Sequence, residues 1–289
     1  MFLLGRRYPQ LRVAICTPAR SLAGKGESAL AYEMILVEHD GPVTTITLNR
    51  PERLNACPPQ MAEEIRDVLA EPGEARCFLI TGAGRAFCSG ADLAARSERP
   101  VTGGRGAYDA LSMSYNPLMM HMAQSAVPIV SAVNGPAAGV GCSIALAADF
   151  VVAGASAYFL QAFVNIGLVP DGGASWMLPR LIGKARATEM MMLGEKIGAE
   201  KAEQWGLIYK AVADEALMDE ARTLAQRLAN GPTLALGQMR ENIHRALEVN
   251  YSAALHQEAV GQRRAGNSQD ALEGGMAFLQ KRKPDFKGQ

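Results

Sequence analysis

The sequence has no excess of charge of either sign and no long apolar run. Its 289 residues include 29 basic and 29 acidic side chains, so the formal net charge is zero. No overall field therefore favours nucleic acid or an anionic membrane surface as a partner. An uninterrupted apolar run of about 18 residues, which a membrane-spanning helix requires, is also missing. We expect no nucleic-acid partner and no membrane span.

Cysteine and histidine are scarce and scattered. None of the five cysteines belongs to a C-x-x-C pair, so the sequence favours small buried thiols in a reducing compartment over a disulfide framework. The four histidines include no pair at metal-ligand spacing with a third ligand nearby. The sequence therefore predicts a cytoplasmic location and no metal site.

The first 33 residues differ in composition from the rest of the chain. Five basic residues precede the first acid, Glu27. Arg12 interrupts the apolar stretch, which argues against a secretory signal. We expect residues 1–33 to be a disordered N-terminal extension. Two alternatives stay open: an organelle transit segment, and an upstream start codon with Met34 as the true beginning.

Short apolar runs alternate with amphipathic segments between residues 34 and 153. Overall, 48% of the residues are hydrophobic and 20% are charged, which is typical of a globular protein. The expected strands cover residues 35–38, 43–48, 77–81, 129–133 and 150–153. Helices are expected over residues 59–70 and 142–148, and residues 94–120 form a glycine-rich loop that becomes a helix near Tyr108. This alternation predicts βαβ units and a mostly parallel sheet covered on both faces.

Helical patterns dominate after about residue 185. The expected helices cover residues 184–193, 199–204, 214–229, 232–247, 251–261 and 268–281. The fold class is therefore α/β. We divide its globular part into a core over residues 34–195 and a helical C-terminal region over residues 196–289.

Two segments share the order buried strand, glycine-containing turn, helix. The first turn spans residues 82–90 and leads to a helix near Ala91, and the second spans residues 135–140 and leads to a helix near Gly141. A helix N-terminus presents backbone N–H groups without internal partners, and glycine lets the backbone approach a ligand closely. Two such turns that converge would form a two-donor hole for an oxyanion. Either turn alone is also compatible with an ordinary strand-to-helix connection.

Other chemistries fit the turns less well. A phosphate loop needs Gly-Lys-Ser/Thr after the turn, and neither turn has it. A dinucleotide fingerprint needs a third glycine where the sequence has Phe87. Cys88 as a nucleophile needs an activating base, and no histidine is near it in sequence. The pattern therefore favours a role for the backbone N–H groups.

Four ordered segments carry a resemblance to a known family. They read LNRPERLNA at 48–56, GRAFCSGADL at 84–93, AVNG through GVG at 132–141, and EGGMAF through KRKP at 273–284. They resemble the crotonase (enoyl-CoA hydratase/isomerase) superfamily, and the resemblance covers about residues 34–287. It implies a spiral ββα core, a helical C-terminal region used in trimerisation, and a homotrimer or dimer of trimers. It also implies an acyl-CoA thioester substrate, with coenzyme A as part of the substrate and no permanently bound cofactor.

The resemblance also implies site residues. The backbone N–H groups of Ala91 and Val140 would form the oxyanion hole, Cys88 would serve packing, and Asp92 would cap local backbone. Arg53 and Lys281, with Lys283 nearby, would hold the coenzyme A part. The full set of expected substrate-binding residues is Arg53, Ala56, Ser89, Gly90, Asp92, Leu93, Gly139, Phe163 and Lys281.

The sequence departs from the hydratases of this family at two positions. They carry two glutamates where this chain has Ser143 and Phe163, and a serine and a phenylalanine cannot supply the acid and base that hydration needs. Asp171 is the remaining acid in that region, and it is similar in position to the acid of the family's isomerases. We expect it to be the catalytic base, with a pKa raised by apolar neighbours, namely Phe163, Ile166, Leu168, Val169 and Trp176. A role as helix N-cap is the alternative.

The leading hypothesis is an enoyl-CoA isomerase with Asp171 as its proton shuttle. It would shift a 3-enoyl double bond to the 2-position in fatty acid metabolism, or open ring-epoxidised phenylacetyl-CoA to its oxepin isomer in phenylacetate catabolism. The resemblance between residues 166 and 208 favours the latter. A hydratase with another base, a dehalogenase and a non-catalytic acyl-CoA-binding trimer stay open. Candidate walls of the acyl pocket are Tyr108, Met113 and Tyr115.

Overall fold

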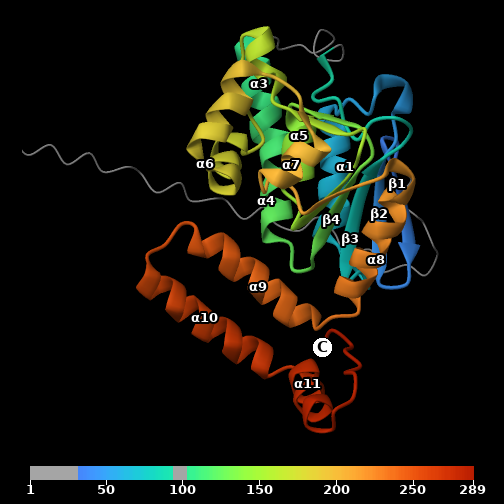
Figure 1. Cartoon of the computed structure of the whole chain (residues 1–289), viewed down its shortest axis with the longest axis vertical. Helices are drawn as coiled ribbons and strands as arrows, with labels where there is room; N and C mark the ends of the chain where they lie inside the picture. The colour runs from blue at the N-terminus through green and yellow to red at the C-terminus, as the bar shows by residue number, and fades with distance from the viewer. Residues whose placement is uncertain (1–31, 94–102) are drawn as a thin grey trace, which may run out of the picture. The chain divides into compact units, whose positions relative to one another are not determined.

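The computed structural model describes residues 32–93 and 103–289, and residues 32–289 cluster as one compact unit (Figure 1). Most of the expected N-terminal extension therefore lies outside the described residues, as does the start of the expected loop at 94–120. The described part of the chain begins at Tyr32, slightly before Met34. Tyr32 packs against the core, and the backbone N–H groups of Glu33 and Met34 donate to the Glu64 carboxylate at 3.2 and 2.9 Å.

A six-stranded sheet is the centre of the described unit. Its strands run in the order β1-β2-β3-β4-β6-β9, and all neighbours are parallel except the β1–β2 pair. These strands are β1 (Ile35–Asp40), β2 (Val43–Leu48), β3 (Cys77–Gly82), β4 (Ile129–Val133), β6 (Phe150–Gly154) and β9 (Lys210–Val212). A smaller sheet, in the order β5-β7-β8, contains β5 (Pro136–Ala138), β7 (Tyr158–Leu160) and β8 (Ile197–Gly198).

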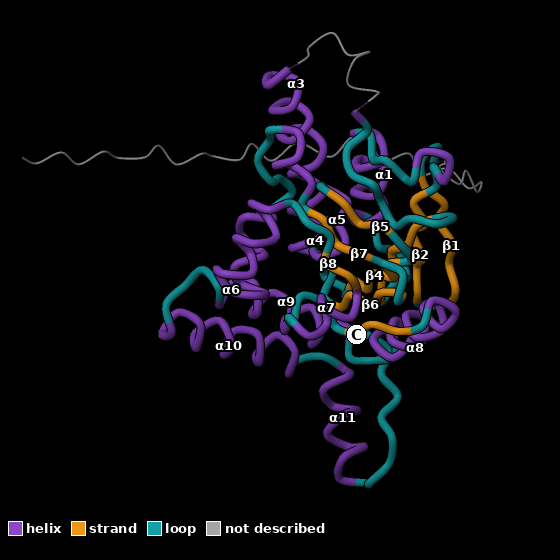
Figure 2. The backbone as a smooth tube through the Cα atoms, turned by 45° about the horizontal axis from the view of Figure 1, so that its top comes forward, coloured by secondary structure: helices purple, strands orange, loops and turns teal. Residues whose placement is uncertain are grey.

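Helices of several lengths surround these sheets (Figure 2). The α-helices are α1 (Pro59–Ala70), α3 (Gly103–Ala110), α4 (Asn116–Gln124), α5 (Val140–Leu146), α6 (Ala174–Leu193), α7 (Ala199–Gln204), α8 (Leu217–Ala229), α9 (Thr233–Ala246), α10 (Tyr251–Gly266) and α11 (Gln269–Leu279). The shorter turns are η1 (Pro51–Arg53), the π-helix η2 (Leu111–Tyr115), η3 (Ala162–Ile166) and η4 (Asp214–Ala216).

Several expected helix boundaries are wrong. The helix expected near Tyr108 begins at Gly103, and α5 begins at Val140 instead of Cys142. The helix expected at 184–193 is the second part of α6; a first part, which was not expected, begins at Ala174 and is separated from it by the non-helical backbone of Gly183. Helix α10 continues to Gly266. Boundaries fail in this way because tertiary contacts can extend a helix past the residues whose apolar spacing indicates it.

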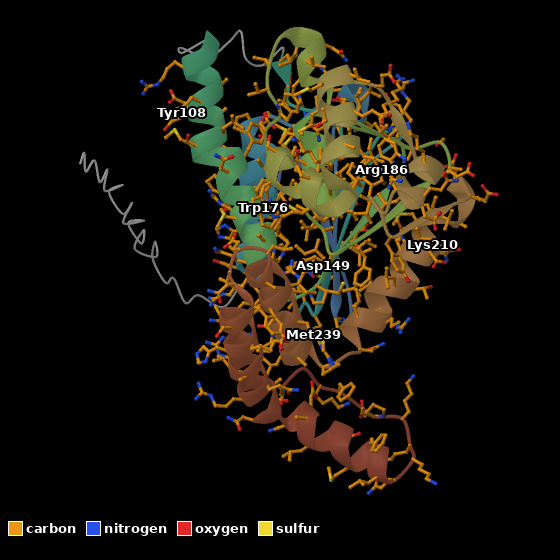
Figure 3. The ribbon with its side chains drawn as sticks, turned by 60° about the vertical axis from the view of Figure 1, so that its left-hand side comes forward. Tyr108, Asp149, Trp176, Arg186, Lys210 and Met239 are labelled. Atoms are coloured by element: carbon orange, nitrogen blue, oxygen red, sulfur yellow. The ribbon has the colours of Figure 1, made fainter. Side chains whose placement is uncertain are left out.

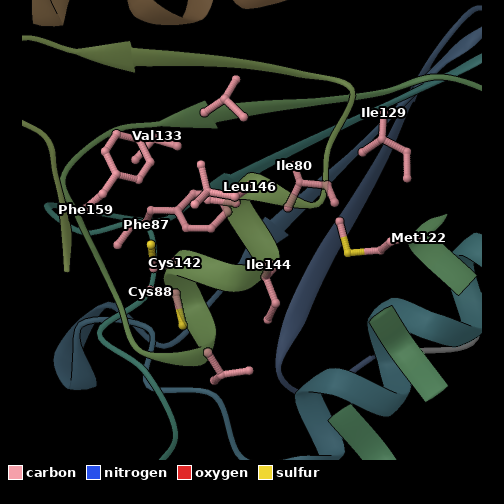
Figure 4. Packing of buried hydrophobic residues seen from close by; sticks show 14 of the residues in the cluster. Ile80, Phe87, Cys88, Met122, Ile129, Val133, Cys142, Ile144, Leu146 and Phe159 are labelled. Carbon is pink, nitrogen blue, oxygen red and sulfur yellow. The ribbon is translucent and has the colours of Figure 1, made fainter. Parts of the chain in front are cut away.

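Both faces of the large sheet are covered, as the alternation of strands and helices predicted. All residues of β3 and β4 are buried, which is typical of parallel strands packed on two sides. One face carries α8, whose Leu217, Ala221, Ala225 and Ala229 pack against the sheet. The other face carries the larger core, where aromatic, aliphatic and thiol side chains from α4, α5 and the two sheets meet (Figure 4).

The C-terminal helices are joined to the core by buried polar contacts. Arg240 of α9 pairs with Asp149 at 2.6 Å and donates to the Met122 carbonyl at 2.9 Å and to the Ser125 carbonyl. Helices α9 and α10 lie side by side, and Ser268 caps α11 by accepting from Ala271 N–H. Among the described residues, each helix is too short or too polar to cross the apolar interior of a bilayer.

Candidate active site

The two glycine turns lie side by side. Cys88 and Ala137 form a parallel bridge, in which Cys88 N–H donates to the Pro136 carbonyl at 3.0 Å and Ala138 N–H donates to the Cys88 carbonyl at 2.9 Å. The bridge joins segments 49 residues apart (137 − 88). The expected convergence of the turns is therefore present.

Glycine is required where the turns touch. Gly90 has φ +111°, and a Cβ added to it would lie 3.2 Å from the Ala138 carbonyl oxygen. Gly139 has φ +53°, and its added Cβ would lie 3.8 Å from Gly90 Cα. Residues other than glycine rarely adopt a backbone φ in this range, and a Cβ on Gly90 would push the two turns apart.

The hydrogen bonds around Ala91 fix the direction of its N–H group. Cys57 N–H donates to the Gly90 carbonyl at 2.7 Å, and the Cys57 carbonyl accepts from Asp92 N–H at 3.1 Å. In a trans peptide group the C=O and N–H point in opposite directions. Ala91 N–H, which shares its peptide with the Gly90 carbonyl, therefore points away from Cys57. Ala91 itself forms a parallel bridge with Cys57, and helical backbone follows two residues later, at Leu93.

Val140 N–H is directed by the first turn of α5. The Gly139 carbonyl accepts from Ser143 N–H at 3.2 Å as the first bond of that helix. Val140 N–H, in the same peptide as that carbonyl, points out of the helix N-terminus. The N–H groups of Ala91 and Val140 are therefore both directed by hydrogen bonds to the carbonyl of the same peptide group, which points the opposite way.

Two asparagine side chains hold the first turn in place. Asn55 is fully buried and donates to the carbonyls of Ala83 and Ala86 at 2.9 and 2.7 Å. Asn134 donates to the carbonyls of Gly82 and Gly84 at 2.8 and 2.9 Å. These four carbonyls accept hydrogen bonds from side-chain amides, which take the place of the backbone donors that a strand or helix would supply.

A cavity of about 220 Å³ adjoins both turns. Twelve of the residues singled out in the sequence line it: Ser89, Gly90, Ala91, Asp92, Leu93, Tyr115, Gly139, Val140, Phe163, Ile166, Leu168 and Asp171. Residues that sequence reasoning missed complete the wall: Ala107, Ala110, Leu111, Ala162 and Asn165. The spacing of Ala107, Ala110 and Leu111 on one helical face was a signal for them.

Asp171 lies at the cavity and is partly exposed. Gly173, not Asp171, occupies the N-cap position of α6. The hydroxyl of Ser143 donates to the backbone carbonyl of Asp171 at 3.0 Å. Gly172, at φ +59°, packs so closely that an added Cβ would lie 2.7 Å from Ser143 Cβ. Ser143 therefore fastens the Asp171 segment to the helix that carries Val140.

The expected apolar surroundings of Asp171 are only partly present. Phe163 is buried in the cavity wall, and Ile166 and Leu168 line the same cavity although they are also exposed to solvent. Val169 is 80% exposed and lies off the wall. Trp176 lines a separate groove.

The second acid at the cavity, Asp92, forms an ion pair. Arg50 Nη1 donates to Asp92 Oδ2 at 2.8 Å and to the Ala56 carbonyl at 2.6 Å. This contact bridges the first motif and the first turn, 42 residues apart. The capping that we expected from Asp92 concerns the residues after Leu93, which lie outside the described part of the chain.

Three expected substrate-binding residues lie off the cavity wall. Arg53 is exposed in η1, Ala56 accepts from Arg50, and Lys281 is exposed after α11. Two of the three expected acyl-pocket residues also lie elsewhere. Tyr108 and Met113 are 65% and 71% exposed, whereas Tyr115 lines the cavity.

Thiol chemistry at the turns is disfavoured. The four cysteines in the described residues are buried and unpaired by disulfides. Burial raises the pKa of Cys88 to about 11 and the pKa of Cys142 to about 12. Only the thiolate is a good nucleophile, so Cys88 at neutral pH is a packing residue.

Comparisons with known proteins show which family the chain is similar to. The profile of the enoyl-CoA hydratase/isomerase family matches residues 38–289. A 1,2-epoxyphenylacetyl-CoA isomerase from Escherichia coli is 43% identical over 263 residues, which are 89% of this chain and 99% of the relative. A carnitinyl-CoA dehydratase from Citrobacter koseri is 38% identical over 86% of this chain and 96% of its own. The crystal structure of an enoyl-CoA hydratase from Bacillus anthracis matches with a TM-score of 0.84 at 31% identity, covering 89% of this chain and all of that one.

The two sheets with their helical C-terminal region, together with these matches, define a crotonase fold. The chain belongs to the enoyl-CoA hydratase/isomerase family of enzymes.

Proposed function

We propose that this chain is an enoyl-CoA isomerase that works through a thioester enolate. One observation carries the proposal: Asp171 lines the same cavity as two turns whose N–H groups, on Ala91 and Val140, are directed by their neighbours. The positions that resemble the hydratase glutamates hold Ser143 and Phe163. One carboxylate suits an isomerase, because moving a double bond involves no net gain or loss of protons.

The mechanism follows from this arrangement. The thioester carbonyl of the substrate accepts hydrogen bonds from Ala91 N–H and Val140 N–H. These bonds stabilise the enolate that forms when Asp171 removes a proton from the acyl chain. Asp171 then returns the proton to another carbon. Each N–H donor is expected to lower the barrier by about 2.7–4 kcal/mol, the range found when one oxyanion donor is removed.

We propose a ring-epoxidised phenylacetyl-CoA as the substrate class. The support is the relative that is named for this reaction and is 43% identical over most of both chains. Small side chains at Ala107 and Ala110 in the cavity wall leave room for a ring beside Phe163. Opening the epoxide to the oxepin is an isomerisation, so no atom is added or lost.

Hydration is the second candidate, because a relative named carnitinyl-CoA dehydratase is also similar over most of its length. Mass spectrometry of the product separates the two. The proposal predicts that the purified protein converts 3-enoyl-CoA or epoxyphenylacetyl-CoA to products of unchanged mass. A product heavier by one water would establish a hydratase, and a trapped aspartyl ester a dehalogenase-type mechanism. Tight binding without turnover would support a non-catalytic protein.

We also propose that the chain assembles as a homotrimer or dimer of trimers through its C-terminal helices. Exposed apolar side chains on α9, α10 and α11 support this, for example Met239, Ile243 and Phe278 (Figure 3 labels Met239). Arg53 and Lys281 would then meet the coenzyme A part at or near a subunit interface. Light scattering after size-exclusion chromatography tests the assembly, and a monomer would contradict it. The cytoplasmic location stays a prediction.

A further inference from the structure

The carbonyl of Cys57 accepts two hydrogen bonds. One comes from Asp92 N–H at 3.1 Å, and the other comes from the phenol of Tyr115 at 2.6 Å. Cys57 N–H in turn donates to the Gly90 carbonyl at 2.7 Å. The peptides on both sides of Ala91 are therefore held by Cys57, and Cys57 is held by Tyr115.

The phenol of Tyr115 is itself placed by an unusual element. Tyr115 ends the π-helix η2, in which Asn116 N–H reaches back to the Leu111 carbonyl. Single π-turns are rare and occur frequently at functional sites. Ser114 fastens η2 to α1 by donating to Glu63 Oε1 at 2.6 Å, and the Tyr115 ring is buried at the cavity. The hydroxyl thus has a fixed location.

We propose that Tyr115 is a positioning residue for the oxyanion hole. The inference rests on the proposed function, since it assumes that Ala91 N–H stabilises the enolate. An oxyanion donor is effective only when it is aimed at the place where charge develops. The Tyr115 hydroxyl fixes the Cys57 carbonyl by a hydrogen bond. Cys57 in turn is hydrogen-bonded to the peptide groups on both sides of Ala91, which keeps Ala91 N–H in its direction.

Tyr115 acts through Cys57 and not on the substrate carbonyl. A tyrosine hydroxyl has one proton to donate, and that proton is directed to the Cys57 carbonyl. Without the hydroxyl, the Cys57 carbonyl keeps only the longer bond from Asp92 N–H, and the Gly90–Ala91 peptide can rotate away from its working direction.

The test compares Tyr115→Phe with Tyr108→Phe. Both variants remove only a phenol hydroxyl, and α3 and η2 follow each other directly in the chain. Tyr108, however, is 65% exposed and projects from α3 (Figure 3). The probe is cinnamoyl-CoA, whose absorbance moves to longer wavelength when its thioester carbonyl is polarised. Turnover of 3-hexenoyl-CoA is measured in parallel.

Tyr115→Phe is expected to reduce the red shift of bound cinnamoyl-CoA and to lower kcat about fivefold to tenfold, with KM changed less than about twofold. Tyr108→Phe should match the wild type in both. A full red shift in Tyr115→Phe would overturn the inference, even if kcat fell. Absence of a red shift in the wild type would instead contradict the oxyanion hole of the proposed function. If Tyr115→Phe does not fold, Tyr115→Met, which fills similar space without a hydroxyl, is measured in its place.

Discussion

The hydroxyl of Ser143 fastens the Asp171 segment to α5. It donates to the Asp171 carbonyl and is completely buried. Ser143→Ala should lower the free energy of unfolding by about 1 kcal/mol and kcat about fivefold, because the Asp171 segment loses its anchor. Urea unfolding and turnover of 3-hexenoyl-CoA measure the two effects.

Ser131 supplies the matched control for this prediction. Its hydroxyl is equally buried but has no hydrogen-bond partner among the described residues. Ser131→Ala should therefore leave both stability and kcat nearly unchanged. Equal behaviour of the two alanine variants would show that the Ser143 hydroxyl does not support the site.

The buried thiols are expected to resist alkylation. Burial raises the pKa of Cys77 and Cys142 to about 12 and that of Cys88 to about 11. A raised thiol pKa lowers the thiolate fraction at pH 8, and burial also blocks access. Iodoacetamide at pH 8 should leave these three cysteines unmodified in the native protein and modify them in urea, as peptide mapping can measure. Fast native labelling of Cys88 would reopen its candidacy as a nucleophile.

At the scale of elements, α5 depends on its close contact with the first turn. A Cβ added to Gly141 would lie 2.5 Å from the Cys88 carbonyl oxygen and 2.6 Å from Cys88 Sγ. Gly141→Ala should destabilise the protein by about 1–3 kcal/mol, since backbone must move to make room. Gly198→Ala is the control, because nothing lies within 4 Å of its added Cβ. Thermal unfolding measures both, and equal melting temperatures would contradict the close packing of α5.

Helices and strands were predicted well where a continuous or periodic pattern of apolar residues marks them. The buried strands at 77–81 and 129–133 and the helix at 59–70 follow from continuous or periodic apolar residues, and the structure confirms them. The π-turn at Leu111–Tyr115 could not be predicted, because its i→i+5 bonding depends on how Ser114 and Tyr115 dock on the core. The Arg50–Asp92 pair was also missed, since residues 42 apart meet only in the folded chain.

At the scale of the whole molecule, a partly buried ion pair joins the C-terminal helices to the sheet. Arg240 is 6% exposed, and its partner Asp149 also accepts from Ile129 N–H at the start of β4. Figure 3 labels Asp149 and, next to Arg240 in the chain, Met239. Arg240→Met leaves the Asp149 carboxylate without its charge partner and should destabilise the protein by about 3 kcal/mol.

Arg264 provides the comparison for Arg240. It is 59% exposed on its side chain and pairs with Glu241 at 3.3 Å. Exposed pairs contribute about 0–1 kcal/mol, so Arg264→Met should change the free energy of unfolding by less than about 1 kcal/mol. Similar losses in the two variants, measured by urea unfolding, would contradict the anchoring role of Arg240.

The motifs that carry the family resemblance predicted most of the residues that line the cavity. Local sequence patterns did not predict which side chains hold those residues in place. Twelve of the singled-out residues line one cavity, and the Cys88–Ala137 bridge brings the motif residues of the two turns together there. Arg53 and Lys281 lie off this wall. Their roles stay predictions that depend on the assembly.

The rate of 3-hexenoyl-CoA isomerisation by the wild type and by Asp171→Asn tests the central claim most directly. Asparagine keeps the shape of the side chain but cannot carry a proton between two carbons. The account predicts clear turnover in the wild type and a loss of at least about 100-fold in the variant, with binding of the acyl-CoA retained. Turnover by Asp171→Asn at the wild-type rate would contradict the account.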